Sequence, residues 1–300
     1  MPESRLPGPH GMKFSPQHSA TLIAGEEHSV LVCVQDVAVA SPCTLMPSRS
    51  TGLQPSDVRR YYDEWTEKYL EFFGESIQAH RPSRESDLLD YLMTQAGIRH
   101  GQHILDAGCG ICGPARHFVR HRQCTVEALT ISPVQADIAG ERNRAAALDA
   151  RIHVTVGDFH ELTAIYGRET FDLVYFLESL SHSSRPGQVL RSVYEVLKPG
   201  GIVYIKDFFI LVRDTPEDQE RVLKVIERID ATFAVKSPWP SEIRDALRHA
   251  GFLPLLVTNP RFEDDRSVWR QFAGKHQFDL YGDQEPFECW EWLEMRSQKP

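Results

Sequence analysis

The chain has 300 residues, and its 42 acidic side chains outnumber its 33 basic ones, which gives a formal net charge of −9 with histidine neutral. With 41% hydrophobic and 25% charged residues, the composition is that of a globular protein with one large domain or two small ones. The acidic balance argues against broad nucleic-acid binding, which needs a basic surface. No apolar run approaches the roughly 20 residues of a membrane span, and we predict no signal peptide, because no charged segment followed by an apolar one opens the chain. The six cysteines stand at irregular positions, so we expect no disulfide framework and a cytoplasmic location.

The first segment, residues 1–54, is rich in Pro, Ser, Gly and His and lacks helical periodicity. We predict an irregular extension here, with one strand at residues 30–34. A tail or the remnant of a tag is the alternative interpretation.

A helical cap is predicted at residues 55–84. Ser56 is a plausible N-cap, and Gly74 ends the helix that follows it. Apolar and aromatic side chains recur along that helix at three- and four-residue spacing, which predicts one aromatic face. They are Val58, Tyr61, Tyr62, Trp65, Tyr69, Phe72 and Phe73.

The main domain is predicted at residues 85–300, and it begins with a helix at about 85–95. Apolar strands are expected at residues 103–107, 125–131, 152–156, 171–176, 202–210, 252–257 and 287–295. Helices are expected at residues 114–121, 133–147 (with Ser132 as its N-cap), 186–197 and 241–250. Their alternation with the strands predicts an α/β fold, a doubly wound, Rossmann-like and mostly parallel sheet of seven strands. A lid at about residues 211–240 follows the fifth strand and contains a helix that Thr215 caps.

The glycines Gly108, Gly110 and Gly113 form a GxGxxG pattern directly after the first strand and before a helix. In that position backbone amides and a helix N-terminus can approach a ligand closely. A dinucleotide is the first alternative for this ligand. However, Asp106 would repel a pyrophosphate and could hold an ammonium group, and the second strand does not end in the acidic residue that binds a ribose.

The segment 105–110, Leu-Asp-Ala-Gly-Cys-Gly, resembles motif I of the class I S-adenosylmethionine-dependent methyltransferases. The likeness continues through Val-Gly-Asp-Phe at residues 156–159 and Leu-Lys-Pro-Gly-Gly at residues 197–201. It implies that S-adenosylmethionine is the cofactor. By the family pattern, Asp106, Gly108 and Gly110 hold its methionine end, while Asp158 and Phe159 contact its adenine.

Three further segments narrow the resemblance. Leu-Thr-Ile-Ser-Pro-Val-Gln at residues 129–135 resembles sterol, cyclopropane-fatty-acid and isoprenoid C-methyltransferases. The Tyr-Tyr-Asp at 61–63 and the segment 176–182 resemble the same group, with prenyl diphosphate enzymes such as those acting on geranyl diphosphate nearest. The lid and C-terminal region depart from the sterol enzymes, which puts a sterol substrate in doubt. The resemblance implies that five more residues contact the cofactor: Tyr61, Tyr62, Thr130, Ile131 and Gln135.

Two residues after the fourth strand are the candidate catalytic groups. If an alkene accepts the methyl group, a carbocation forms, and a base must then remove one proton. Glu178 lies where open α/β sheets bind ligands, and its sequence neighbours are apolar, which favours a carboxylate base. His182 is the alternative base or an orienting partner. The other interpretations of Glu178 are a carboxylate paired with an arginine and a carboxylate buried only to bind the amino group of the cofactor.

Candidate substrate contacts come from three regions of the chain. Phe73, Phe208 and Trp239 supply aromatic faces of the kind that stabilise a cation. His80 and Arg81 supply positive charge for a diphosphate. Mg²⁺ is expected only together with that diphosphate, because no acidic metal cluster is visible. The pair Cys109 and Cys112 lacks the second pair that a zinc site needs, so we assign it no metal.

The predicted function is therefore C-methylation of an isoprenoid alkene, with a prenyl diphosphate such as geranyl diphosphate as the expected substrate. An O- or N-methyltransferase acting on a small metabolite is the second possibility, and a cofactor-binding protein without turnover is the third. The expected partner is a small molecule, with no nucleic acid. The prenyl chain length and the oligomeric state, including a homo-oligomer, stay open.

Overall fold

The computed structural model describes residues 52–260, 262 and 266–300. The predicted strand at residues 30–34 and all but the last three residues of the predicted extension lie outside this range. Among the described helices, none combines the length and the apolar character needed to cross a membrane.

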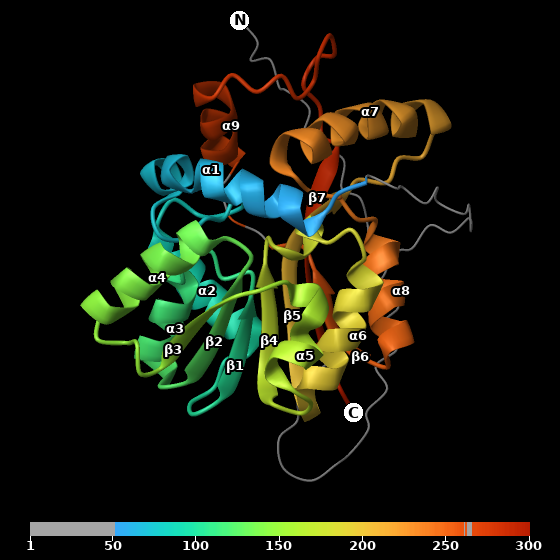
Figure 1. Ribbon diagram of the computed structural model, residues 1–300. Helices are drawn as coiled ribbons and strands as arrows, with labels where there is room; N and C mark the ends of the chain where they lie inside the picture. Colours follow the sequence, from blue (N-terminus) through green and yellow to red (C-terminus); the bar gives the residue numbers. More distant parts are fainter. Residues whose placement is uncertain (1–51, 261, 263–265) are drawn as a thin grey trace, which may run out of the picture. The chain divides into compact units, whose positions relative to one another are not determined.

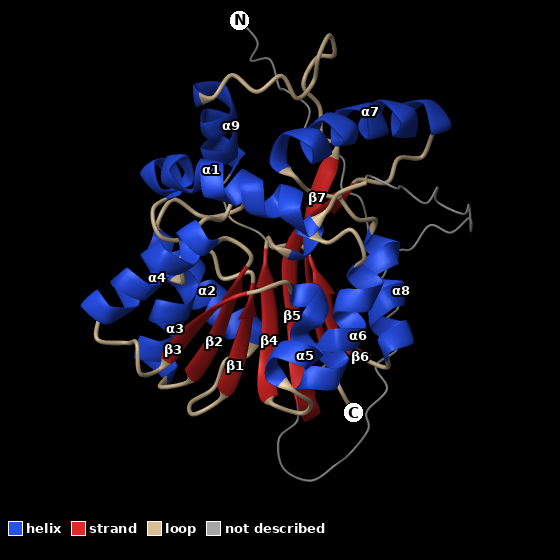
Figure 2. Ribbon diagram, viewed as in Figure 1, coloured by secondary structure: helices blue, strands red, loops and turns tan. Residues whose placement is uncertain are grey.

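One sheet of seven strands forms the centre of the described chain, in the order β3-β2-β1-β4-β5-β7-β6 (Figure 2). The strands from β3 to β5 are parallel, and β7 runs antiparallel to both of its neighbours. This order confirms the predicted doubly wound, mostly parallel sheet. The strands are β1 (His103–Ala107), β2 (Thr125–Thr130), β3 (Ile152–Val156), β4 (Phe171–Leu177), β5 (Leu197–Ile210), β6 (Leu253–Thr258) and β7 (Trp290–Gln298).

The helices include two that the sequence pattern did not predict, α5 and α9. The others begin and end within a few residues of their expected bounds. The helices are α1 (Pro55–Phe73), α2 (Glu85–Ala96), α3 (Gly113–Arg122), α4 (Pro133–Ala145), α5 (Leu162–Tyr166), α6 (Pro186–Val196), α7 (Pro216–Phe233), α8 (Pro240–Ala250) and α9 (Arg266–Lys275). Two short 3-10 turns, η1 (Phe159–Glu161) and η2 (Leu180–His182), follow β3 and β4.

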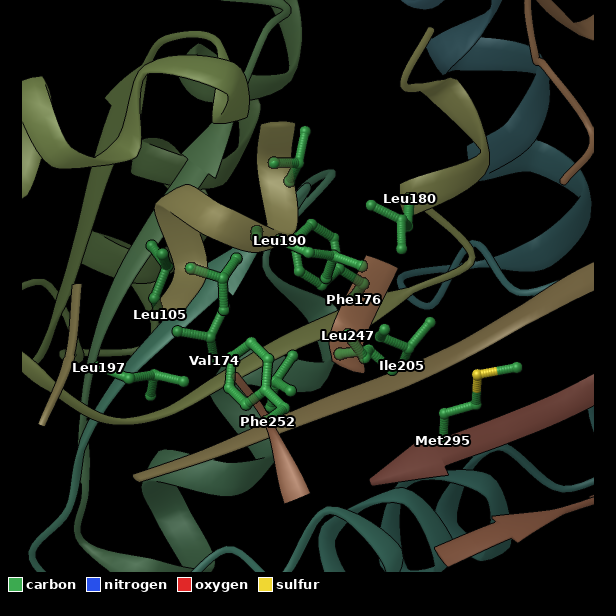
Figure 3. Close-up of a cluster of buried hydrophobic side chains, with 14 of the residues drawn as sticks. Leu105, Val174, Phe176, Leu180, Leu190, Leu197, Ile205, Leu247, Phe252 and Met295 are labelled. Atoms are coloured by element: carbon green, nitrogen blue, oxygen red, sulfur yellow. The ribbon is translucent and has the colours of Figure 1, made fainter. Parts of the chain in front are cut away.

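Alternate residues of the central strands enter two separate cores, one on each face of the sheet. Leu105, Val174 and Ile205 pack with α5, α6 and α8 on one face (Figure 3). Their neighbours Ile104 and Tyr175 pack with α2 and α3 on the other. Because side chains alternate along a strand, helices on both faces require strands that are apolar almost throughout, as the sequence of β4 is.

A third apolar cluster joins α1, α7 and α9 to the ends of β5 and β7. In Figure 1 these helices lie beyond the carboxyl ends of the parallel strands. Tyr69 of α1 stacks on Phe272 of α9, with ring centroids 5.0 Å apart. The aromatic face predicted for α1 therefore packs against helices, and it roofs the edge of the sheet where α/β proteins bind ligands.

The start of α1 differs from the prediction. Gln54, and not Ser56, is the N-cap, because Pro55 occupies the first helical position and Gln54 forms a reciprocal capping box with Asp57. The predicted N-caps Ser132 and Thr215 are confirmed. Each side chain accepts a hydrogen bond from the backbone N–H three residues later.

Candidate active site

The glycine loop connects β1 to α3 and is tied to β2. The backbone N–H groups of Gly108 and Cys109 both donate to the carbonyl of Leu129, at 2.9 Å. Gly108 has φ +106°, and a Cβ there would lie 2.5 Å from Cβ of Ser179. Gly110 has φ +53°, and a Cβ there would lie 4.0 Å from Cδ1 of Ile77, so the backbone conformation is what favours glycine at this position.

Gly113, the third glycine of the pattern, has a different role. A Cβ at this position would lie 2.0 Å from the carbonyl oxygen of Glu75. The absence of a side chain therefore admits the loop that follows α1. Gly108 and Gly110 are therefore needed for the loop that approaches the ligand, whereas Gly113 is needed for the packing of the segment that roofs the site.

A cavity opens beside this loop. It is lined by the ends of β1, β2, β3 and β4 and by α1. Tyr61 does not line it, because its hydroxyl is buried against that of Tyr69. The other residues predicted to contact the cofactor all do: Tyr62, Asp106, Gly108, Gly110, Thr130, Ile131, Gln135, Asp158 and Phe159.

Asp106 supplies a buried carboxyl group to this cavity. The side chain is 2% exposed, and the hydroxyl of Tyr175 donates to its Oδ2 at 2.7 Å. Burial raises the pKa of Asp106 to about 7, against the smaller, opposing effect of the Tyr175 hydrogen bond. A cation in the cavity would stabilise the ionised form, so this position suits an ammonium group.

The end of β2 holds the amide of Gln135 in place. The hydroxyl of Thr130 donates to Oε1 of Gln135 at 2.8 Å, which leaves the amide nitrogen with hydrogens to donate. Ser132 accepts from the backbone N–H of Gln135 and donates to Asp63 of α1 at 2.6 Å. The cap of α4 is therefore bonded to the roof helix.

Asp158 lies at the end of β3 and caps η1. Its Oδ1 accepts from the backbone N–H of His160 and is 2.6 Å from Nδ1 of the same residue. Partial burial alone would raise the pKa of Asp158, but the hydrogen bonds and charge of His160 outweigh it and lower the pKa overall. The ionised carboxylate can accept a further bond from an exocyclic amine in the cavity.

A second cavity adjoins the first. The two share four lining residues: Tyr62, Ile77, Glu178 and His182. The rest of its lining is almost wholly apolar and aromatic, and comes from α1, α7, β5, β7 and the loops beside them. These residues are Tyr69, Phe73, Ala79, Phe208, Ile229, Phe233, Val235, Trp290 and Trp292.

Glu178 lies at the junction of the two cavities, and its surroundings differ from the apolar ones expected. Its carboxylate accepts from Nζ of Lys206 at 2.5 Å and from the backbone N–H groups of Ala79 at 2.6 Å and His80 at 3.2 Å. Lys206 is fully buried and also donates to Gln78 and to the carbonyl of His80. Glu178 has φ +55°, a backbone conformation that a residue with a side chain rarely adopts.

His182 lies at the same junction, in η2. Its Nδ1 is 2.8 Å from the carbonyl of Ala234, which can only accept, so Nδ1 carries the proton. Nε2 is then the acceptor, and the hydroxyl of Tyr62 donates to it at 2.8 Å. Desolvation by burial lowers the pKa of His182 to about 4, against the smaller effect of the Ala234 bond. The imidazole is therefore neutral near pH 7.

The predicted substrate contacts divide into two groups. Phe73 and Phe208 line the second cavity, whereas Trp239 is buried at the start of α8 and lines neither cavity. Arg81 is buried and donates to the carbonyls of Phe73 and Ser76. His80 does not line the second cavity, and its ring stacks on Trp292 with centroids 5.0 Å apart.

The charge of the second cavity does not match a diphosphate. Among the described residues that line it, none is Lys or Arg, and Glu178 is the charged group. Neither His80 nor Arg81, the residues predicted to bind a diphosphate, lines either cavity, and both side chains contact other parts of the protein.

Several residues that line the cavities, and Lys206 behind them, were not predicted from the sequence. The loop at residues 75–79 follows α1 without a motif, and only Gly113 hinted that a backbone segment approaches there. Trp290 and Trp292 alternate along β7, a period-two pattern that puts both on one face. Lys206 continues an apolar strand, and a lone lysine in such a run signals a buried partner.

The cysteines of the glycine loop are free thiols. Cys109 and Cys112 are both buried, and burial raises the pKa of the Cys109 thiol. The described parts of the chain contain no group of three or more His, Cys, Asp or Glu side chains placed to hold a metal ion.

Comparison with known families agrees with this geometry. Residues 105–205 match the model of the methyltransferase domain. The chain belongs to the class I S-adenosylmethionine-dependent methyltransferases. The match spans β1 to the middle of β5 and so includes the glycine loop, the ends of β2 and β3, and both candidate catalytic residues.

Curated relatives include sterol C-methyltransferases. The chain is 30% identical over 200 residues to sterol 24-C-methyltransferase of Kluyveromyces lactis, covering 66% of this chain and 52% of that one. It is 32% identical over 142 residues to 24-methylenesterol C-methyltransferase 3 of Arabidopsis thaliana, covering 47% and 39%. The chain thus spans about half or less of the length of these relatives.

Solved structures share the fold at lower identity. The cyclase SpnF aligns with a TM-score of 0.69 at 21% identity, covering 85% of this chain and 98% of that one. Geranyl diphosphate C-methyltransferase of Streptomyces coelicolor, solved with Mg²⁺, geranyl-S-thiolodiphosphate and S-adenosylhomocysteine, aligns with a TM-score of 0.64 at 17% identity, covering 85% and 100%. Because the same fold carries a cyclase, fold alone does not fix the reaction.

The first cavity fits S-adenosylmethionine. Its buried carboxyl group, Asp106, suits the ammonium of the methionine end, and Gly110 admits close approach. The amide of Gln135 lies at the end of β2, and Asp158 with the ring of Phe159 lies at the end of β3, where ribose and adenine would follow. When bound, the cofactor supplies an electrophilic methyl group.

Proposed function

We propose that this protein transfers the methyl group of S-adenosylmethionine to an alkene carbon of a neutral isoprenoid. One observation carries the proposal: the cofactor cavity opens, through Tyr62, Ile77, Glu178 and His182, into a second cavity with an aromatic lining. A substrate in that second cavity would present its reacting atom at the junction, in line with the methyl group.

The lining suits the chemistry of an alkene. Methyl attack on a trisubstituted alkene leaves a tertiary carbocation, which water would capture. The faces of Phe233, Trp290 and Trp292 exclude water and offer π density to a cation. A proton must then leave to restore a double bond, and Glu178 and His182 both lie at the junction as candidate acceptors.

A neutral substrate fits the charge better than a diphosphate does. The predicted prenyl diphosphate would place two phosphates in a cavity whose described lining contains a carboxylate and no Lys or Arg. The curated relatives named above act, by their names, on sterols, which are neutral isoprenoids. Sterol-type alkenes therefore replace geranyl diphosphate as the preferred substrate class, and the predicted Mg²⁺ belongs only to the diphosphate alternative.

The two other possibilities predict different sites. An O- or N-methyltransferase could use His182 to deprotonate a hydroxyl or an amine, but a small polar metabolite would find few polar partners in the second cavity. A cofactor-binding protein without turnover would not need a second cavity at all. The aromatic cavity favours neither.

The test is a substrate panel with methyl-labelled S-adenosylmethionine. The panel contains desmosterol and cycloartenol as neutral alkenes, geranyl diphosphate, catechol and phosphoethanolamine. We expect label in a new carbon–methyl bond of a neutral sterol, identified by mass spectrometry, and none with the Asp106→Asn control. Transfer to geranyl diphosphate alone would overturn the neutral class. Transfer only to catechol or phosphoethanolamine would overturn C-methylation.

A further inference from the structure

Two acidic or basic groups lie at the junction of the cavities, and their hydrogen bonds assign them different tasks. Glu178 accepts from three N–H donors, one of them the ammonium of Lys206. A proton arriving at this carboxylate would compete with all three. His182 has an acceptor nitrogen, Nε2, and the hydroxyl of Tyr62 donates to it.

We propose that the proton released during alkene methylation leaves through Tyr62 to His182, and that Glu178 is a fixed negative charge beside the carbocation. This inference rests on the proposed function. Tyr62 is then a catalytic residue that touches the substrate, His182 accepts the proton through it, and Lys206 positions Glu178.

The step balances as follows. The π electrons of the alkene form a bond to the methyl carbon, and the carbon–sulfur bond breaks with its electron pair remaining on sulfur. The cation then loses a proton from an adjacent carbon, and the electrons of that C–H bond form the new double bond. Oη of Tyr62 takes this proton while its own hydroxyl proton passes to Nε2 of His182. The phenol stays neutral, and the imidazole becomes an imidazolium beside the carboxylate of Glu178.

The protein holds the imidazole in the orientation that this relay needs. Its Nδ1–H donates to Ala234, which caps α7 with φ +51°. The turn that carries His182 is fixed on both sides of the preceding residue, Ser181. The backbone N–H of Ser181 donates to Asp207 at 3.0 Å, and its carbonyl accepts from the N–H of Lys236 at 2.7 Å.

Glu178 is held as firmly as His182, and its position suits an electrostatic role rather than proton transfer. The side chain is 9% exposed and its partner Lys206 is 0% exposed, so the pair lies in a region of low dielectric constant. The two backbone amides come from the loop after α1, and Gln78 of that loop also binds Lys206. A carboxylate held this way stabilises a nearby cation without having to move.

The experiment compares the products of three single variants and one double variant, with desmosterol as the probe. We expect Tyr62→Phe and His182→Gln to lower the rate of formation of the normal olefin by on the order of 100-fold or more. Both variants should divert part of the turnover to an alcohol or a shifted double bond. The double variant should be no slower than either single one, since both residues serve one step. Glu178→Gln should slow total turnover and leave the product composition unchanged.

A matched control separates the relay from a general effect on the cavity. Tyr69→Phe removes a hydroxyl from the same helix and the same cavity, but this hydroxyl is bonded to Tyr61 and not to His182. Its products should keep the double bond of the wild type. Product composition is a ratio, so partial unfolding of a variant does not change it.

Two results would overturn the inference. If Glu178→Gln alters the product composition while Tyr62→Phe does not, Glu178 is the base, and the proposed function stands. If the wild-type protein binds S-adenosylmethionine but methylates neither desmosterol nor cycloartenol, the proposed function fails and the relay fails with it. If His182→Gln does not fold, the product composition of Tyr62→Phe alone tests the relay.

Discussion

The two cavities are built in different ways. The cofactor cavity lies at the ends of four neighbouring parallel strands, and short motifs that directly follow those strands supply most of its lining. The substrate cavity is assembled from α1, α7, β5, β7 and the loop at residues 75–79, which lie far apart in the chain. Local sequence therefore specifies the first cavity, and tertiary packing specifies the second.

This difference explains how each cavity can vary. A parallel sheet fixes where its strands end, so a glycine or carboxylate after a strand is placed by the fold itself. The second cavity depends on the packing of amphipathic helices, whose faces allow many side chains. The same family can thus keep one cofactor and change its substrates.

The largest effect on cofactor binding should come from Gly108→Val, which changes the cofactor cavity and not the substrate cavity. The new side chain would meet Ser179 within 2.5 Å and would sit at φ +106°. We expect cofactor affinity to fall roughly 1000-fold, a loss of about 4 kcal/mol, measured by calorimetry. Gly140→Ala is the control, because only the end of the flexible Arg144 lies near that Cβ. Unchanged affinity in a folded Gly108→Val protein would show that this loop does not approach the cofactor.

Lys206→Met should damage the second cavity instead. It leaves Glu178 without its buried cation, and breaking a buried pair in this way costs about 3–5 kcal/mol of folding free energy. Urea unfolding would measure it. Lys198→Met is the matched control, since the side chains of its pair with Asp172 are 42% and 32% exposed, and a pair this accessible to water contributes about 1 kcal/mol or less. Equal losses in both variants would mean that the Lys206 pair is not specially buried in solution.

The sequence predicted the cofactor cavity better than the substrate cavity for a physical reason. Asp106 lies at the end of β1, and Gly110 and Asp158 come within three residues of the ends of β1 and β3, so predicting the strands also placed these residues. Arg81 and Trp239 were predicted from residue type alone. Whether a cationic side chain or an aromatic ring faces a cavity depends on tertiary packing, which no short sequence segment specifies. Arg81 turns to the carbonyls at the end of α1, and Trp239 enters the helical core.

The secondary structure shows the same difference between elements that local sequence specifies and elements that depend on tertiary packing. The five alternating strands and their helices were predictable from apolar runs and from caps such as Ser132. Helix α5 has only five residues, too few for a periodic pattern, and α9 lies in a polar stretch whose apolar face is visible only once Phe272 is seen to pack on α1. Of these two elements, α5 packs on a face of the sheet and α9 belongs to the roof.

Asp106→Asn should separate stability from binding in the cofactor cavity. The pKa of Asp106 is about 7 in the folded protein and near 3.8 in the unfolded chain, so ionisation of this group destabilises the fold as pH rises from 4 to 7. Asparagine removes that effect while it can still accept from Tyr175. We expect the apo variant to gain up to about 4 kcal/mol over the wild type at pH 8 and almost nothing at pH 4, because one pKa unit is about 1.4 kcal/mol. Urea unfolding at both pH values measures this. A gain that does not depend on pH would contradict the raised pKa, while loss of cofactor binding should accompany the variant throughout.

The smallest effect should come from Ser132→Ala, which tests the connection between the two regions. Ser132 caps α4 beside the cofactor cavity and also donates to Asp63 of α1, the helix that roofs both cavities. Thr215→Ala removes an N-cap of the same kind from α7, where the hydroxyl is exposed and has no bond to α1. Each substitution should cost about 1 kcal/mol of stability through the lost cap. Only Ser132→Ala should also weaken cofactor binding, by roughly threefold to tenfold, since a neutral hydrogen bond contributes about 1 kcal/mol. Thermal unfolding and calorimetry on both variants give the two quantities. If both variants bind the cofactor as the wild type does, the Asp63 bond does not hold α1 over the cofactor, and the roof is positioned by its apolar packing on α9 alone.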